Sequence, residues 1–72
     1  MTQNDRLTNY LRTHKGGITQ REATRELSIG RLSARIEELR RKGIDIRDEY
    51  ETNVNRYGER TRYKRYWLME EV

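Results

Sequence analysis

The stretch "LSARIEELRRKGIDI" (residues 32–46) changes its hydrophobic spacing partway along. Its first apolar residues recur at intervals of four and three, the spacing of one face of a helix: Leu32, Ile36 and Leu39. The last two lie two residues apart, as in a half-buried strand: Ile44 and Ile46. Gly43 separates the patterns and can take the left-handed conformation that ends a helix. The sequence therefore predicts a helix over about 31–42 joined by one glycine to a strand over about 44–50.

A first helix is predicted over about 4–14, where apolar residues recur at helical spacing: Leu7, Tyr10 and Leu11. Thr2 or Asn4 can cap its start, because either side chain can accept a hydrogen bond from a free backbone N–H. Gly16 and Gly17 are expected to end this helix.

A second helix is predicted over about 20–27 from a capping box. Thr19 stands three residues before Glu22, so each side chain can satisfy a backbone N–H at the helix start. The turn that follows, at 28–30, contains turn-forming residues on both sides of Ile29, and we expect Ile29 to anchor this turn in the core.

A β-hairpin is predicted at the C-terminal side, with strands over about 44–50 and 61–68 and a long loop at 52–60 that contains Asn and Gly. A register that pairs Ile44 with Leu68 joins apolar to apolar residues on the core side and opposite charge to opposite charge. The other pairs in this register are Ile46 with Tyr66, Asp48 with Lys64, and Tyr50 with Arg62.

The composition limits what the chain can be. Its 72 residues suggest a single domain, 1–72, with a small core, because a domain near this size buries only roughly 60% of the surface that its unfolded chain exposes. With no Cys and one His, we expect no disulfide, metal or cofactor. No apolar run approaches the roughly 20 residues that span a bilayer, which predicts a soluble, cytoplasmic protein. Glu70 and Glu71 are expected to fray.

The positive charge is concentrated in two segments. Residues 31–42 and 56–65 hold 10 of the 16 basic residues and only 3 of the 12 acidic ones, so these segments carry +7 and the remainder carries −3. Because clustered basic residues attract polyanions, this distribution favours a nucleic-acid partner.

The order of predicted elements resembles that of a winged helix-turn-helix domain: helix, short strand at Ile18, helix, tight turn, helix and hairpin. The most specific residues for this resemblance are Leu32, Ile36, Leu39, Gly43 and Ile44. The resemblance covers nearly the whole chain, and "RLSARI" in the third helix and "RYG" in the hairpin are similar to small phage and prophage helix-turn-helix proteins. It implies an α+β fold and a transcriptional regulator or DNA-architecture factor that is nucleoid-associated in a bacterial or phage-infected cell.

In such domains the third helix enters the major groove of double-stranded DNA and the hairpin, or wing, reaches the neighbouring backbone or minor groove. Three groups of residues are candidates for DNA contact. On the third helix they are Arg31, Ser33, Ala34, Arg35 and Arg41. At the second helix they are Gln20 and Arg21. In the wing they are Arg56, Arg60, Arg62, Lys64 and Arg65, interleaved with Tyr57 and Tyr63, with Arg56 chosen for the minor groove.

Simpler readings stay open at this point. The charged helix face can be merely solvated, and Arg62 and Lys64 can pair with acidic residues of the neighbouring strand: Asp48, Glu49 and Glu51. Trp67 on the outer sheet face could mark a protein partner, and Tyr57 with Tyr63 could stack on RNA bases. No catalytic constellation emerges, so we expect no enzyme, and the oligomeric state stays open.

Overall fold

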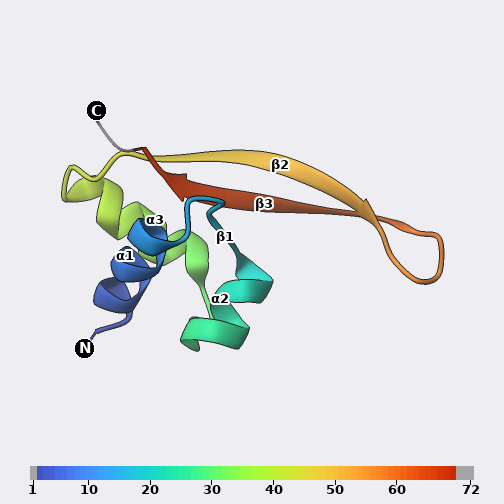
Figure 1. Ribbon diagram of the computed structural model, residues 1–72, viewed down its shortest axis with the longest axis horizontal. Coiled ribbons are helices and arrows are strands. Elements are labelled where there is room, and N and C mark those ends of the chain that lie inside the picture. The colour runs from blue at the N-terminus through green and yellow to red at the C-terminus, as the bar shows by residue number, and fades with distance from the viewer. Residues whose placement is uncertain (1, 70–72) are drawn as a thin grey trace.

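The computed structural model describes residues 2–69, so the expectation for Glu70 and Glu71 lies outside the described residues. A short strand at Ile18 lies between the first two of three helices, and a two-stranded hairpin follows the third helix (Figure 1). This order confirms the predicted α+β fold with a hairpin wing. The elements in chain order are α1 (Gln3–Thr13), β1 (Ile18–Thr19), α2 (Gln20–Leu27), α3 (Leu32–Arg41), β2 (Ile46–Val54) and β3 (Arg60–Leu68).

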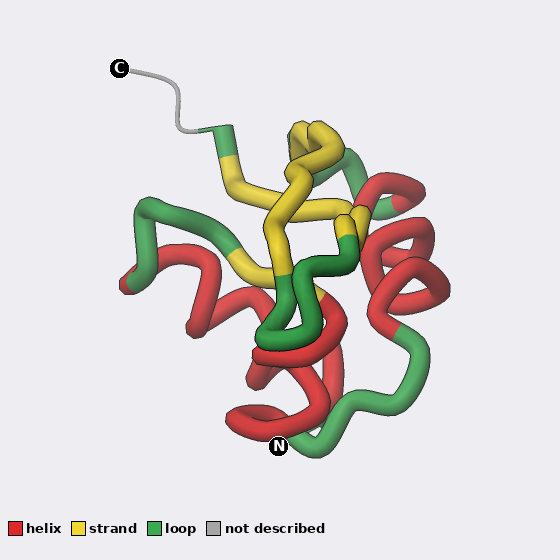
Figure 2. Tube along the Cα trace, turned by 90° about the vertical axis from the view of Figure 1, so that its right-hand side faces the viewer, coloured by secondary structure: helices red, strands yellow, loops and turns green. Residues whose placement is uncertain are grey.

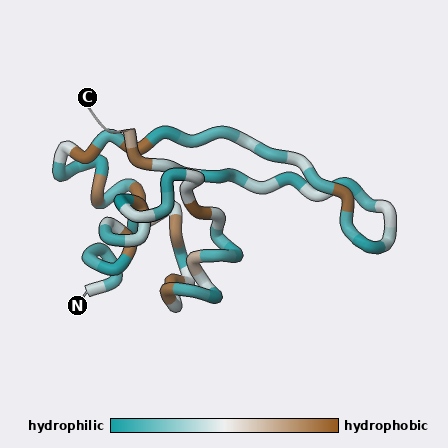
Figure 3. Tube along the Cα trace, in the orientation of Figure 1, coloured by the Kyte–Doolittle hydropathy of each residue, from teal (hydrophilic) through white to brown (hydrophobic). Residues whose placement is uncertain are grey.

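The three strands form one antiparallel sheet in the order β1-β3-β2, so β3 is the central strand. Seen nearly along the hairpin, the helices lie below and to either side of the strands (Figure 2). The projecting part of the hairpin is largely hydrophilic (Figure 3). Hydrophobic side chains from every element meet between the helices and the near end of the sheet: Leu7, Leu11, Ile18, Ala23, Ile29, Leu32, Ile36, Leu39, Ile46 and Tyr66.

Both α1 and α2 begin with a capping box. The Thr2 hydroxyl accepts a hydrogen bond from the Asp5 N–H at 3.1 Å, and the Thr2 N–H donates to the Asp5 carboxylate at 3.3 Å. At α2 the Glu22 N–H donates to the Thr19 hydroxyl at 3.3 Å, and the Thr19 N–H donates to the Glu22 carboxylate at 3.2 Å. Each pair satisfies backbone donors that a helix start leaves free.

The turn between α2 and α3 takes its left-handed residue from Ser28 rather than from a glycine. Ser28 has φ 56° and ψ 37°, and it closes α2. Ile29 follows with no exposed surface, as expected for an anchor in the core. The next helix then begins at Leu32, only three residues further along.

Two glycines have distinct backbone roles. Gly43, with φ 92°, follows α3 and allows the chain to turn toward β2. Gly17, with φ 81°, lies so close to the central strand that a Cβ atom would stand 2.2 Å from the Tyr66 carbonyl oxygen. The prediction that glycines end α1 is wrong, because the helix already ends at Thr13 and His14 is extended.

The register of the hairpin differs from the predicted one by two residues. Ile46, rather than Ile44, lies opposite Leu68, and Tyr50 lies opposite Lys64 rather than Arg62. Because the shift is even, every side chain keeps its predicted face of the sheet. β2 begins at Ile46 rather than at residue 44, but both strands run further toward the turn than predicted, and the loop shrinks from 52–60 to a turn at 55–59.

Candidate nucleic-acid interface

Arg40 ties the last turn of α3 to the first residues of the wing. Its Nε and Nη2 atoms donate to the Ile46 carbonyl oxygen at 3.1 and 2.8 Å, and Nη2 also contacts the Asp48 carboxylate at 2.8 Å. The hydrogen bond from Arg40 lowers the pKa of Asp48, and the same bond raises the pKa of Arg40. Helix and wing are therefore held together by side-chain bonds as well as by the short connection through Gly43.

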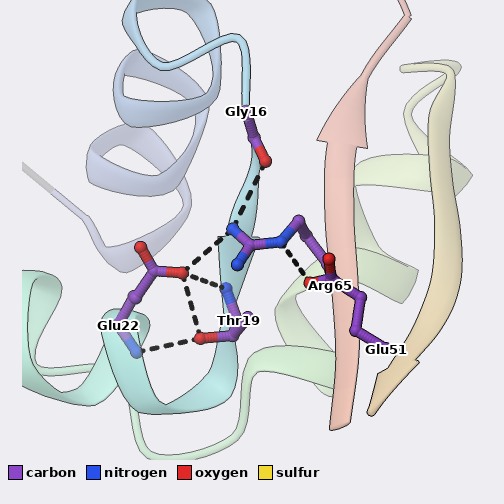
Figure 4. Close-up of polar contacts among 5 residues, drawn as sticks. All are labelled: Gly16, Thr19, Glu22, Glu51 and Arg65. Carbon is purple, nitrogen blue, oxygen red and sulfur yellow. Dashed lines mark hydrogen bonds and ion pairs between the residues drawn. The ribbon is translucent and has the colours of Figure 1, made fainter. Parts of the chain in front are cut away.

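A second arginine ties the wing to the start of α2 (Figure 4). Arg65 on β3 contacts the Glu22 carboxylate at 3.2 Å, donates to the Gly16 carbonyl oxygen at 3.3 Å and pairs with Glu51 on β2. The hydrogen bond to Glu51 is the largest cause that raises the pKa of Arg65. Arg65, a candidate for DNA contact in the wing, thus has its guanidinium engaged in contacts that organise the fold.

Gln20 holds α2 and α3 at their mutual angle. Its amide oxygen accepts the Leu32 N–H at 2.7 Å, one of the donors that the start of α3 leaves free. Its amide nitrogen donates to the Ile29 carbonyl oxygen at 2.9 Å and to the Thr24 hydroxyl at 3.0 Å. The Gln20 side chain, a candidate for DNA contact, is thus engaged within the protein, where it positions α3.

A groove of about 520 Å³ lies between β3 and the first turns of α2 and α3. It brings together residues from both basic segments and from α2, including the candidates Gln20, Arg21, Ser33, Arg62 and Lys64. Four of its lining residues are basic and none is acidic. Its full lining is Thr19, Gln20, Arg21, Leu32, Ser33, Asn53, Thr61, Arg62, Tyr63, Lys64, Arg65 and Tyr66.

The electrostatics of this groove favour an anion. The N-terminal turns of two helices border it, and the partial positive charge of a helix start adds to that of the basic side chains. Arg21, Arg62 and Lys64 form no ion pair with any other residue in the range 2–69. Their charge is therefore available to an external partner.

Tyr50 supports two of these cations. The Arg62 guanidinium lies 3.9 Å from the centre of the Tyr50 ring, and the Lys64 ammonium lies 4.8 Å from it, both within the range of cation–π contacts. Neither Arg62 nor Lys64 forms an ion pair with Asp48, Glu49 or Glu51 in the described part of the chain, although the charge of Lys64 also helps to lower the pKa of Asp48. An aromatic ring thus orders both cations without neutralising them.

The candidates on α3 differ in how available they are. Arg31 is exposed at the N-cap position and Ser33 is exposed in the groove. Ala34, also a candidate for DNA contact, is half-buried. Arg35 is also half-buried and pairs with Glu38 at 2.6 Å, so it would have to leave this carboxylate to reach DNA.

The remaining candidates lie outside the groove. Arg41 is exposed in the last turn of α3, and Arg56 is exposed in the turn of the hairpin. Arg60 is exposed at the start of β3 and borders a smaller depression on the wing. None of these three forms an ion pair within the described part of the chain.

Several features of this surface were not predicted. Asn53 and Thr61 line the groove as uncharged hydrogen-bonding groups, and charge counting cannot find such residues. Trp67, which the protein-partner alternative needed exposed, is half-buried. Tyr63, considered for RNA stacking, is also half-buried and belongs to the groove.

Residues 2–69 contain neither a metal-binding cluster nor a membrane-spanning helix. No group of three or more His, Cys, Asp or Glu side chains is arranged to hold a metal ion. None of the described helices has the length and the apolar character needed to cross a membrane.

Comparison with known proteins agrees with this geometry. A family model described as a winged helix-turn-helix domain matches residues 2–71. No curated protein and no solved structure matches the chain. Domains of this family in general bind DNA and are not enzymes. Since the match covers nearly every residue, the chain belongs to the winged helix-turn-helix family.

Proposed function

We propose that this protein binds double-stranded DNA with the first turn of α3 in the major groove and the wing against the neighbouring backbone or minor groove. The observation that carries the proposal is the groove between β3 and the first turns of α2 and α3, whose lining has no acidic residue and holds three cations without an ion pair in the described range: Arg21, Arg62 and Lys64. A groove of this charge attracts a polyanion, and its two walls come from the elements that winged domains apply to DNA.

The residues divide into two roles in this proposal. Arg31 and Ser33, exposed at the start of α3, face base edges, where an arginine can bond guanine O6 and N7 together. Arg21, Arg62 and Lys64 contact phosphates, which fix the position of the protein but carry no sequence information. Arg56 and Arg60 extend this contact along the wing. Arg35, which pairs with Glu38, and Arg41, in the last turn of α3, contribute less to DNA binding than the residues above.

The biological role rests on the resemblance to small phage and prophage proteins. We infer a transcriptional regulator or a DNA-architecture factor of that type. Binding through the wing as well as through α3 would suit either role, because both need a defined orientation on the duplex.

A titration of a mixed-sequence duplex of about 20 base pairs at several salt concentrations tests the proposal. For about 4–6 neutralised phosphates, the logarithm of the affinity should fall with the logarithm of salt at a slope of about −4 to −5. Arg62→Ala should weaken binding and reduce the size of this slope by about 1. Arg31→Ala should weaken binding to a preferred sequence more than to a random one.

Arg47→Ala is the matched control. Arg47 is another exposed arginine of the hairpin. In the strand register it lies on the face of the sheet opposite to that of Arg62, and it pairs with Asp45. Its replacement should leave DNA affinity within about twofold, as expected of a surface charge that contacts no phosphate. If Arg47→Ala and Arg62→Ala weaken binding equally, or if single-stranded RNA binds and duplex DNA does not, the proposal is wrong.

A further inference from the structure

The turn at 55–59 presents an aromatic side chain that the protein itself does not use. Tyr57 is 78% exposed, the highest exposure among the large hydrophobic residues that stand out at the surface. Its ring makes no stacking or cation–π contact with any residue from 2 to 69. It therefore adds nothing to the core and is available to a partner.

The backbone that carries Tyr57 is ordered by a single side chain. The amide oxygen of Asn55 accepts hydrogen bonds from the N–H groups of Tyr57 at 2.9 Å and Glu59 at 3.0 Å. The Asn55 backbone closes the turn through its N–H to the Glu59 carbonyl oxygen at 2.9 Å and its carbonyl oxygen to the Gly58 N–H at 3.0 Å. Gly58 takes φ 80°, which glycine adopts without strain. The backbone that carries the ring is therefore already ordered, and binding does not have to order it.

The charges around Tyr57 favour a nucleic acid over an apolar partner. Arg56 precedes it and Arg60 begins the next strand, and both are exposed. The one carboxylate of the turn, that of Glu59, is turned back to the Asn55 amide at 3.4 Å. An aromatic ring between free cations is the arrangement that stacks on bases while the cations hold the backbone.

The wing is also long enough to bring this ring to bases beyond those that α3 would reach. Asn53 and Thr61 line the groove beside Ser33, and Tyr57 lies four residues beyond either of them, which is up to about 13 Å at 3.3 Å per residue. In Figure 1 the turn at the end of the hairpin lies far from all three helices. The ring can thus reach bases a few base pairs beyond those next to the first turn of α3.

We propose that Tyr57 is a base-stacking residue, and that its ligand is an unpaired or unstacked base within duplex DNA. This inference rests on the proposed DNA binding and gives it a substrate preference. A normally stacked base has no free face, so the ring gains its full contact only where a bulge, a mismatch or a flexible step frees one.

Two duplexes of identical sequence, one of which carries a single bulged adenine, test the inference by fluorescence anisotropy. The protein should bind the bulged duplex about fivefold or more tightly, the lower end of the effect of stacking one base on an aromatic ring. Tyr57→Phe should keep this preference. Tyr57→Ala should abolish it and leave affinity for the intact duplex within about twofold. With 2-aminopurine at the bulge, wild type and Tyr57→Phe should quench its fluorescence, and Tyr57→Ala should not.

The inference is wrong if the wild type shows no preference for the bulge, or if Tyr57→Ala retains the preference. It is also wrong if single-stranded DNA of the same sequence binds more tightly than the bulged duplex, because the site would then read a strand rather than a base within a duplex. The proposed function fails separately, through absent binding to the intact duplex or an inert Arg62→Ala. Because Tyr57 is largely exposed, folding does not complicate these comparisons.

Discussion

Arg40 in the last turn of α3 and Asp48 on β2 form an ion pair of 2.8 Å, and the same guanidinium bonds the Ile46 carbonyl oxygen. Through these contacts the helix proposed to enter the major groove and the wing proposed to grip the backbone keep one relative orientation. A small core could not hold a long hairpin by packing alone, because only its near end reaches the buried cluster.

Replacement of Arg40 should therefore destabilise the protein. Arg40→Ala leaves the Ile46 carbonyl oxygen and the Asp48 carboxylate without their donor, which should lower the free energy of unfolding by about 1–3 kcal/mol. Urea unfolding measures the change. Arg41→Ala, next in the chain, is the control, because Arg41 is exposed and forms no ion pair in the described range, and it should change stability by less than about 0.5 kcal/mol. Equal effects of the two variants would contradict this role of Arg40.

The same pair predicts a pH dependence. The hydrogen bond from Arg40 lowers the pKa of Asp48 below its ordinary value of 3.8. The carboxylate therefore contributes stability that is fully present above the ordinary pKa and is lost as pH falls through the lowered one. Asp48→Asn should be less stable than wild type at pH 6, and this difference should shrink below pH 3.8.

Urea unfolding at pH 6 and at pH 3 measures this difference. Asp45→Asn provides the control, since Asp45 is 61% exposed and its pair with Arg47 is a surface contact. It should show almost no such change between the two pH values. A gap between wild type and Asp48→Asn that stays constant with pH would show that the pair does not couple to folding.

Tyr50 should affect DNA binding without contacting DNA. Tyr50→Leu removes the ring that holds Arg62 and Lys64, so these cations should lose order and the affinity for duplex should fall about two- to fivefold, as expected for exposed cation–π contacts of about 0.5–1 kcal/mol. Tyr50→Phe keeps the ring and should bind as wild type does. The salt dependence should stay the same in both variants, because no cation is lost. A steep loss with Tyr50→Phe would instead indicate a direct contact through the hydroxyl.

Gly17 should be the least replaceable glycine. Gly17→Ala places a Cβ 2.2 Å from the Tyr66 carbonyl oxygen and forces a left-handed conformation on alanine, so it should cost about 2 kcal/mol or more. Gly16→Ala is the control, because a Cβ there meets nothing within 4 Å and its φ is not positive. It should be neutral or stabilising by up to about 1 kcal/mol. Thermal unfolding of the two variants decides the matter, and similar midpoints would contradict the close approach.

Much of the fold could be predicted because its signals are local. The capping box at Thr19 and Glu22 marks the start of α2, and the change of hydrophobic spacing across Gly43 marks the passage from helix to strand. The hairpin register could not be found this way. The sequence favoured a register with ion pairs such as Asp48 with Lys64. In the structure the turn closed by Asn55 lengthens both strands, and Asp48 pairs with Arg40 instead.

The candidate site was predictable in its residue types but not in which residues are free. In the sequence Arg35, Arg62 and Arg65 are equally good candidates for DNA contact. In the structure carboxylates hold Arg35 and Arg65, whereas Arg62 lies over an aromatic ring. Arg65 and its partner Glu22 lie 43 positions apart, so no local pattern connects them. The hydrogen bond from the Leu32 N–H to the Gln20 side chain likewise joins residues on either side of a turn.

The separation of the hairpin end from the buried cluster has a consequence for how this protein could change over time. The exposed side chains of Arg56 and Tyr57 touch neither the interior nor the bonds made by Arg40 and Arg65, so new residues at these two positions would leave folding intact. Such a chain could acquire a different target by altering positions 56 and 57, while Asn55, Gly58 and the rest of the scaffold that hold them in place stay as they are.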